Sequence, residues 1–270
     1  MAFALGSRAR SAGYRLAAFE QVGSTNTEAM AHARSGEGGS AWFVTTMQTA
    51  GKGRRQRAWI APRGNLASSV VEVIDVAPAT AATLGFAAGL AIASALQQVS
   101  IEANLRRAGS DPLKYLLKWP NDVLVEKQKL VGISLEAEAV ATGRLAVVVG
   151  IGTNVVAAPT GTPTPATSLA ALGVHIGAEE LFSALSDAWV EFRGIWDNGR
   201  GFADIRRLWL ERAAGLGERV AIHTGKATIE GTFDTIDENG CLIVRTAEGK
   251  HLPIAAGEVY FGSAASVGAA

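Results

Sequence analysis

The feature that most constrains the fold is a long stretch, Val76–Ile101, without a single charged side chain. A segment of this length must be buried, either in a bilayer with an apolar core about 30 Å thick or inside the protein. It is rich in alanine, begins near Pro78 and carries Ser94, Gln97 and Gln98, so its transfer into lipid is too weakly favoured for insertion. Its large apolar residues recur at near-helical spacing. We therefore expect a buried core helix and no membrane span.

Runs of apolar and β-branched residues on both sides of this helix predict strands. Turn residues separate several of the runs, notably Pro120-Asn121-Asp122 and Gly143. The expected strands are 41–47, 66–76, 115–119, 123–126, 130–137 and 145–156. Helical patterning returns over Glu179–Arg212, and Ala157–Thr167, rich in Pro, Thr and Gly, predicts a mobile loop. The pattern indicates an α+β fold, a mixed β-sheet packed with helices and with few long crossovers.

The period changes to two after Gly215-Leu216-Gly217, which predicts a small all-β module. Its expected strands are 219–223, 227–234, 241–245 and 250–254. Asn239-Gly240 lies between two of these runs and is the strongest hairpin signal in the chain. We therefore divide the chain into a flexible lead-in (1–13), a large domain (14–214) and a small C-terminal domain (215–270).

Charge and cysteine content exclude several classes of protein. Lys and Arg together number 25, as do Asp and Glu, so the balance is neutral and does not favour bulk nucleic-acid binding. The only cysteine, Cys241, cannot form an intramolecular disulfide, and the four histidines lack zinc-site spacing. These features fit a reducing cytoplasm and no structural metal.

The sharpest local feature is the loop Gly51–Arg57, which places Lys52, Arg54, Arg55 and Arg57 beside two glycines. Glycine lets backbone N–H groups approach a phosphate, and the cations neutralise charge that develops when a phosphoanhydride breaks. The loop lacks the spacing of a Walker A motif. Its alternative interpretation is a solvated basic loop without a ligand.

Lysine 118 follows a largely apolar run and precedes Trp119-Pro120-Asn121-Asp122. Burial of an ammonium group at the end of a buried strand is strongly unfavourable unless an anion lies beside it. The alternative interpretation is that the Lys118 side chain reaches solvent and binds no ligand. Ser24-Thr25-Asn26 lies at a predicted strand-to-helix turn. Gly150-Ile151-Gly152-Thr153-Asn154 puts glycine in a strand, which indicates either a bulge or the close approach of a ligand.

In this order and spacing, these segments and Lys129-Leu130-Val131-Gly132-Ile133 resemble the motifs of biotin protein ligases. The resemblance runs from about Tyr14 to Phe261. It implies a catalytic domain of the class II synthetase-like, biotin–lipoate ligase type, followed by an SH3-like β-barrel. Since only a short segment precedes Tyr14, we expect the monofunctional type, without the DNA-binding domain of bifunctional relatives.

The resemblance also assigns residues to ligands. Those assigned to biotin are Ser24, Thr25, Asn26, Gln48, Lys52, Gly53, Arg54, Lys118 and Gly132. Those assigned to ATP and the adenylate are Gly51, Lys52, Arg54, Arg55, Trp59, Asn121 and Asn154. Lys118 and Arg54 would be catalytic, with Lys118 beside the biotin carboxylate and the α-phosphorus. Trp59 would stack on adenine and Asn154 would bond to the same base.

The implied reaction has two steps. The biotin carboxylate attacks ATP to give biotinyl-5′-AMP and pyrophosphate, and a lysine of the acceptor then displaces AMP. Mg²⁺ would be required and held mainly by phosphates, with Asp122 as a candidate ligand. The acceptor would be the biotin carboxyl carrier domain of a biotin-dependent carboxylase. The resemblance further implies a homodimer through exposed sheet, no DNA partner and a cytoplasmic location.

Two departures from the family pattern lie in the basic loop. Lys52 stands where the family usually has arginine and lacks its planar fork, and Gln56 replaces a glycine that accepts positive φ cheaply. Three other functions remain open: a lipoate protein ligase, a degenerate biotin binder without adenylation, and a nucleic-acid-binding module that uses the basic loop. The intact Lys-Trp-Pro-Asn-Asp segment favours biotin over lipoate.

Overall fold

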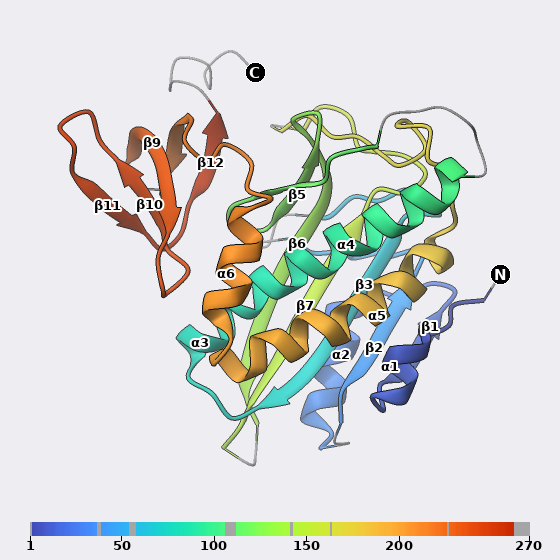
Figure 1. Ribbon diagram of the computed structural model, residues 1–270. Coiled ribbons are helices and arrows are strands. Elements are labelled where there is room, and N and C mark those ends of the chain that lie inside the picture. The colour runs from blue at the N-terminus through green and yellow to red at the C-terminus, as the bar shows by residue number, and fades with distance from the viewer. Residues whose placement is uncertain are drawn as a thin grey trace.

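The computed structural model describes residues 2–36, 39–53, 58–105, 112–140, 143–162, 164–225 and 227–261. These residues form one large and one small β-sheet with helices packed on the large one (Figure 1). The helical elements are α1 (Ser7–Ser11), α2 (Thr25–Arg34), α3 (Pro78–Ala82), α4 (Leu84–Leu105), α5 (Ala178–Trp196), the 3-10 turn η2 (Asp197–Gly199) and α6 (Phe202–Leu210). The predicted α+β class is confirmed.

The large sheet has seven strands in the order β1-β2-β3-β7-β6-β5-β4. They are β1 (Arg15–Phe19), β2 (Ala41–Thr45), β3 (Leu66–Ile74), β4 (Leu116–Lys118), β5 (Asp122–Val125), β6 (Gln128–Ala139) and β7 (Leu145–Thr153). Only β1 and β2 pair in parallel, across α2, and every other pair in the sheet is antiparallel. The sheet is therefore mixed, as predicted.

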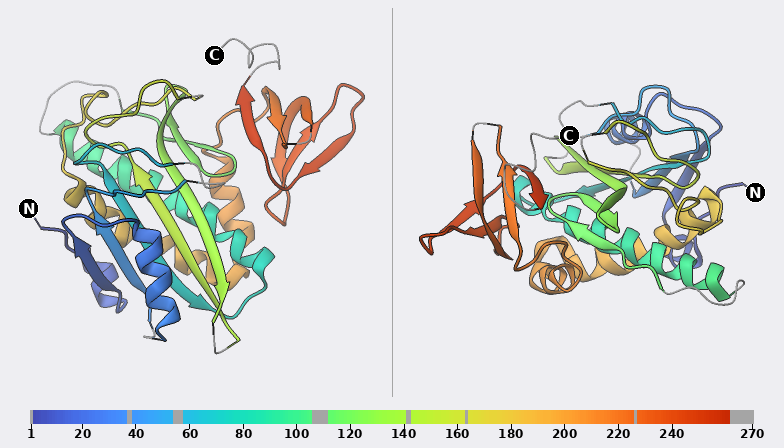
Figure 2. Two further views of the ribbon diagram at one scale, coloured as in Figure 1. Left: turned by 180° about the vertical axis from the view of Figure 1, so that it is seen from behind. Right: turned by 90° about the horizontal axis from the view of Figure 1, so that it is seen from above.

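Side chains alternate between the two faces of this sheet. On β2, Trp42 and Val44 join the core beneath α4 and α5, whereas Phe43 joins a smaller cluster with Ala29 and Met30 of α2. The left view of Figure 2, seen from behind, shows α2 on the face of the sheet opposite α4 and α5, where it covers only part of that face. The uncovered part of the sheet, over β6 and β7, is available for a ligand site.

Helix α4 occupies the charge-free stretch and packs beside α5 on the same face of the large sheet (Figure 1). Within the described residues, Pro78–Ala103 is the one helical segment long and apolar enough to cross a membrane, but 72% of its most apolar window is buried in the protein. Leu90, Ile92 and Leu96 are fully enclosed. Burial within the protein therefore accounts for the absence of charge.

The N-terminal segment differs from the predicted flexible lead-in. Residues 7–11 form α1, and Leu5 and Ala9 are buried. The backbone N–H of Ala9 donates to Asp187 on α5 at 2.9 Å, and that of Gly6 donates to Ser186 at 2.8 Å. These contacts with α5 order a segment whose own sequence shows little apolar periodicity.

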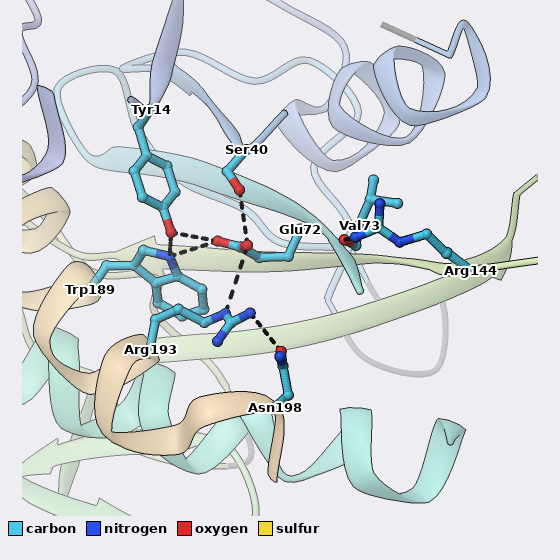
Figure 3. A network of polar contacts seen from close by, with 8 residues as sticks. All are labelled: Tyr14, Ser40, Glu72, Val73, Arg144, Trp189, Arg193 and Asn198. Carbon is cyan, nitrogen blue, oxygen red and sulfur yellow. Dashed lines mark hydrogen bonds and ion pairs between the residues drawn. The ribbon is translucent and has the colours of Figure 1, made fainter. Parts of the chain in front are cut away.

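Behind α5, the carboxylate of Glu72 on β3 anchors a buried polar network (Figure 3). Tyr14 Oη donates to Glu72 Oε1 at 2.6 Å, and Trp189 Nε1 donates to the same oxygen at 3.1 Å. Ser40 Oγ donates to the other oxygen at 2.9 Å, and Arg193 Nε lies 3.7 Å from it. Burial, followed by the charge of Glu72, raises the pKa of Tyr14. The network joins the N-terminal segment to β3 and α5.

The helical stretch predicted over 179–212 is interrupted. Helix α5 ends at Trp196 because Asp197 and Asn198 both adopt positive φ, at 44° and 55°. Asp and Asn tolerate this left-handed conformation better than most residues. The chain turns there and continues as α6, which leads toward the small sheet (Figure 1).

The small sheet is entirely antiparallel, in the order β11-β10-β9-β8-β12. Its strands are β8 (Arg219–His223), β9 (Thr228–Ile236), β10 (Leu242–Arg245), β11 (His251–Ile254) and β12 (Glu258–Phe261). The hairpin predicted at Asn239-Gly240 is confirmed, since β9 and β10 pair across a turn in which Gly240 has a φ of 81°. Periodicity did not predict β12, which is a short strand paired with β8.

The small sheet is attached to the strand that carries Lys118. The backbone N–H of Leu117 donates to Arg212 O at 2.8 Å, and that of Ala214 donates to Leu117 O at 2.9 Å. Next to Lys118, Trp119 Nε1 donates to Gly240 O in the β9–β10 turn at 3.1 Å. The connecting segment and the hairpin therefore hold β4 from two directions.

Candidate active site

A cavity of about 410 Å³ lies at the uncovered face of the large sheet, bordered by α2, by three loops and by β12. Most of the residues that the sequence singled out line it. They are Ser24, Thr25, Asn26, Gln48, Lys52, Gly53, Trp59, Lys118, Asn121, Asp122, Gly132 and Asn154. Gly51 lies behind this lining and accepts a hydrogen bond from the backbone of Trp59 at 2.9 Å. Arg54 and Arg55, with Gln56, lie outside the described residues.

The start of α2 forms one end of the cavity. Helix α2 begins at Thr25, as predicted, but the Ser24 side chain makes no capping hydrogen bond. The backbone N–H of Thr25 instead donates to Gln48 Oε1 at 2.8 Å. Ser24, Thr25 and Asn26 are all buried. The loop that precedes the basic segment thus caps this helix, and the helix's first side chains are left to line the cavity.

A chain of hydrogen bonds continues from Thr25 into the sheet. The Thr25 and Ser69 hydroxyl oxygens are 2.7 Å apart, and Ser69 Oγ donates to Asn26 Oδ1 at 2.6 Å. Asn26 Nδ2 donates to Ser134 Oγ at 3.2 Å and to Glu136 Oε1 at 2.7 Å. Sequence reasoning missed Ser69, Ser134 and Glu136, because strand side chains give no local signal of what they meet across the sheet.

The strand glycines are explained by close approach rather than by a bulge. A Cβ on Gly150 would lie 2.2 Å from Asn26 Oδ1, and one on Gly152 would lie 2.5 Å from the Trp59 indole. A Cβ on Gly132 would also lie 2.8 Å from that indole. The glycines therefore let Asn26 and Trp59 lie directly on the sheet, and Trp59 forms a wall of the cavity.

Lysine 118 projects from the end of β4 and is only 8% exposed. Burial lowers its pKa, the Lys129 charge lowers it further, and Asp122 and Glu258 partly oppose the shift. Its Nζ lies 5.7 Å from the centre of the Tyr260 ring and 5.9 Å from that of Phe261, both on β12. In the described residues it makes no hydrogen bond or ion pair. An entering anion would supply the missing counter-charge.

A second cation, Lys129, lines the same cavity. Its Nζ lies 2.7 Å from Asp122 Oδ1 and 5.6 Å from the centre of the Trp59 indole. The sequence marked the motif around Lys129 without assigning it a role, because Asp122 and Trp59 reach it from other segments. With Lys52, three lysines line the cavity against the two carboxylates of Asp122 and Glu258, and this positive balance suits a phosphate or carboxylate ligand.

Two asparagines at the cavity differ in how their amides are used. Asn154 is 1% exposed, and its Nδ2 donates to Thr167 O at 3.1 Å. Its Oδ1 has no hydrogen-bond partner among the described residues, so it remains a buried acceptor. Asn121 Nδ2 donates to Ile133 O at 2.7 Å and so fastens the Pro120-Asn121 turn to β6. Asn154 is therefore better placed than Asn121 to contact a base.

The segment predicted as a mobile loop, Ala157–Thr167, borders the cavity, and its described residues form no helix or extended strand. Its start is held by Asn65, whose Oδ1 accepts from the backbones of Val155 and Val156, each at 2.9 Å. Its end is held by Lys129, whose backbone N–H donates to Pro165 O at 2.7 Å. Both ends are therefore fixed, and its mobility stays a prediction.

The described residues do not by themselves build a metal site. They contain no cluster of three His, Cys, Asp or Glu side chains that could hold an ion. Asp122, the predicted candidate, is already ion-paired with Lys129. The described lining therefore fits a metal ion that enters together with phosphate oxygens.

Comparison with known proteins identifies the family. Residues 18–154 match the Biotin/lipoate A/B protein ligase family, and residues 215–262 match the Biotin protein ligase C terminal domain. The chain therefore belongs to the biotin/lipoate A/B protein ligase family. Within it, the chain groups with the biotin protein ligases, as the C-terminal match and the following relatives show.

A biotin–[acetyl-CoA-carboxylase] ligase of Paracoccus denitrificans is 39% identical, over 88% of this chain and 97% of its own. The ligase of the same description from Mycobacterium tuberculosis is 33% identical, over 88% of this chain and 86% of its own. The biotin protein ligase of Aquifex aeolicus, solved with biotin and ATP, has the same fold at a TM-score of 0.74 and 23% identity, covering 92% of this chain and 99% of that one. The predicted resemblance is confirmed.

Proposed function

We propose that this protein activates biotin with ATP to form biotinyl-5′-AMP and then transfers biotin to a lysine of a biotin carboxyl carrier domain. The observation that carries the proposal is the pairing of two chemistries in one cavity. Buried hydrogen-bonding side chains around Asn26 suit the ureido ring of biotin, and the two lysines, 118 and 129, suit its carboxylate and the phosphates. The relatives named above support the assignment.

In the first step, a carboxylate oxygen of biotin attacks the α-phosphorus of ATP, the bond to the bridging oxygen breaks, and pyrophosphate leaves. Lys118 stabilises the negative charge on the attacking oxygen and the phosphoryl oxygens, because its buried ammonium faces the cavity and makes no hydrogen bond or ion pair within the described residues. Lys129 supplies a second positive charge from the β6 side. Arg54, for which we propose the same role, lies outside the described residues.

In the second step, the amine of the acceptor lysine attacks the acyl carbon of the adenylate, loses a proton and displaces AMP. The mixed anhydride must be kept from water until then. We propose that the basic loop 51–57 and the loop 157–167 cover it, because Gly53 and Ala58, which flank the undescribed part of the first loop, and several residues of the second border the cavity. Trp59 would stack on adenine, and the buried Asn154 Oδ1 would accept from the base.

We propose that Mg²⁺ enters with ATP and is bound chiefly by phosphate oxygens.

We propose that two copies of the chain associate along β6. Strand β5 pairs only with the first half of β6, up to Gly132, so in the described chain the second half of β6 has no neighbouring strand on that side. Sedimentation with and without biotin and MgATP would test this dimer. We propose residues 14–214 as the catalytic domain, 215–270 as the C-terminal domain, and a cytoplasmic location.

The test of the function is direct. The purified protein is mixed with biotin, MgATP and a carrier domain, and the acceptor mass is measured. A gain equal to one biotinyl group, lost with Lys118→Ala, supports the proposal. Repeating the assay with excess lipoate distinguishes a lipoate ligase, which would modify the carrier with lipoate instead. Biotin binding without pyrophosphate release would indicate a degenerate binder.

A further inference from the structure

Glutamate 136 on β6 lies outside the cavity lining, yet it contacts the side chain on which the buried end of the cavity depends. Its Oε1 accepts from Asn26 Nδ2 at 2.7 Å. We propose that Glu136 is a positioning residue that fixes the direction of the whole hydrogen-bond chain from Asn26 to Thr25, and thereby the cavity's preference for the ureido ring of biotin. The proposal rests on the function proposed above.

The oxygen and nitrogen of the Asn26 amide have nearly the same shape and could exchange places. A carboxylate only accepts hydrogen bonds, so the Asn26 atom facing Glu136 must be the nitrogen. The oxygen is then turned to Ser69, whose hydroxyl lies 2.6 Å away and must donate. Glu136 thus determines the orientation of a side chain that is itself 6% exposed.

The direction continues along the chain because each hydroxyl has a single proton. Ser69 uses its proton on Asn26, so the Thr25 hydroxyl, 2.7 Å away, must donate to Ser69. At the other end, Ser134 Oγ accepts from Asn26 Nδ2 and keeps its own proton. The cavity is therefore offered lone pairs at Thr25 and an O–H donor at Ser134.

Without the carboxylate, the opposite direction would satisfy the same atoms. Ser134 could donate to an inverted Asn26, Asn26 to Ser69, Ser69 to Thr25, and Thr25 to Gln48 Oε1, which lies 3.2 Å from the Thr25 hydroxyl. Both serines and the threonine serve either direction equally. Glu136 is the one member of this chain of contacts that admits a single direction.

The direction matters for a ureido ring, which has N–H donors and a carbonyl acceptor at fixed positions. In the direction set by Glu136, Thr25 meets an N–H with lone pairs and Ser134 offers a proton to an acceptor. In the reverse direction Ser134 spends its proton on Asn26 and can no longer donate to the ring carbonyl, and one of the Thr25 lone pairs is taken by Ser69. The dithiolane ring of lipoate has neither group, so its binding is indifferent to the direction.

Replacing Glu136 by glutamine distinguishes the effect of hydrogen-bond direction from the effect of side-chain packing. Glu136→Gln keeps the size and the hydrogen bond, but its amide can accept or donate and selects neither direction. We expect the biotin Kd, measured by calorimetry without ATP, to rise roughly 3- to 10-fold as the competent direction loses population. The KM for MgATP and the melting temperature should stay unchanged. Glu136→Ala should weaken biotin by a similar factor.

The matched control is Glu138→Gln, two residues along the same face of β6. Glu138 accepts from Arg34 at the surface and touches no part of the chain from Asn26 to Thr25. Its biotin Kd should equal that of the wild type. Wild-type biotin affinity in Glu136→Gln, with a loss only in Glu136→Ala, would show that Glu136 contributes packing alone and would overturn the proposal. Failure of the wild type to bind biotin would instead overturn the proposed function.

Discussion

Two charged side chains buried against the large sheet have opposite surroundings. Glu72 is 5% exposed and Lys118 is 8% exposed, so both have lost most of their contact with water. Three donors and a guanidinium surround the Glu72 carboxylate (Figure 3). The Lys118 ammonium faces a cavity and aromatic rings, without a hydrogen bond in the described residues. A buried charge with a complete set of partners serves the fold, and one without them is available for a ligand.

The strongest test of this comparison is Lys118→Met. We expect pyrophosphate release with biotin and MgATP to fall about 10³-fold, as on loss of a group that stabilises transition-state charge. Thermal unfolding without ligands should not become easier, because the variant removes a buried charge that lacks a partner. Lys114→Met, which changes an exposed lysine on the approach to the same strand, should leave both quantities unchanged. A large loss of stability in Lys118→Met would show that Lys118, like Glu72, stabilises the fold, and would contradict the comparison.

The converse change is Glu72→Ala. We expect the free energy of unfolding to fall by about 3 kcal/mol, because Tyr14, Trp189 and Arg193 lose a shared buried acceptor. The KM values for biotin and MgATP should not change, since Glu72 does not line the cavity. Urea unfolding and steady-state kinetics measure the two effects. Glu191→Ala, which removes an exposed pair with Arg8, should cost less than about 1 kcal/mol.

The lowered pKa of Lys118 predicts a pH dependence. Adenylation should decline as pH rises through this lowered pKa, below the value of about 10.4 for a free lysine, because the ammonium loses its charge. In the ligand-free protein the stability should rise over the same interval, since the unfolded state there binds more protons than the folded state. Lys118→Arg should lack both changes, because arginine stays charged. Identical profiles for both proteins would contradict the assignment.

The smallest expected effect concerns Trp59, whose indole lies directly on the glycines of β6 and β7. In Gly152→Ala the new methyl group would meet the indole at 2.5 Å, so the ring must shift. We expect the KM for MgATP to rise roughly fivefold, equivalent to about 1 kcal/mol of overpacking. Gly194→Ala on α5, where no atom lies within 4 Å of the new methyl, should leave the kinetics unchanged. An unchanged KM in Gly152→Ala would separate Trp59 from nucleotide binding.

The elements of the fold were largely predictable because their signals are local. The charge-free stretch around α4, the period of two after Gly217 and the Asn239-Gly240 turn each depend on neighbouring residues. The ordering of α1 was not predictable, because it depends on Asp187 and Ser186 far along the chain. The helix break after Trp196 follows from two residues in the left-handed conformation, Asp197 and Asn198, which the pattern of apolar residues does not predict.

The site was predictable where a motif concentrates its chemistry and not where partners converge from distant strands. Lys118 and Asn154 could be identified within their own segments. The function of Gly150 could not, because the atom that requires its missing side chain belongs to Asn26. Lys129 acquires its setting only when Asp122 and Trp59 are placed beside it.

The position of β12 in the chain bears on biosynthesis. Residues 257–260 complete the cavity beside Lys118, yet they are translated after every other residue that lines it. The large sheet can emerge from the ribosome with its lysines in place while the wall beside them is still missing. A nascent or prematurely ended chain would therefore hold a reactive adenylate poorly, and full activity would report that synthesis has passed β12.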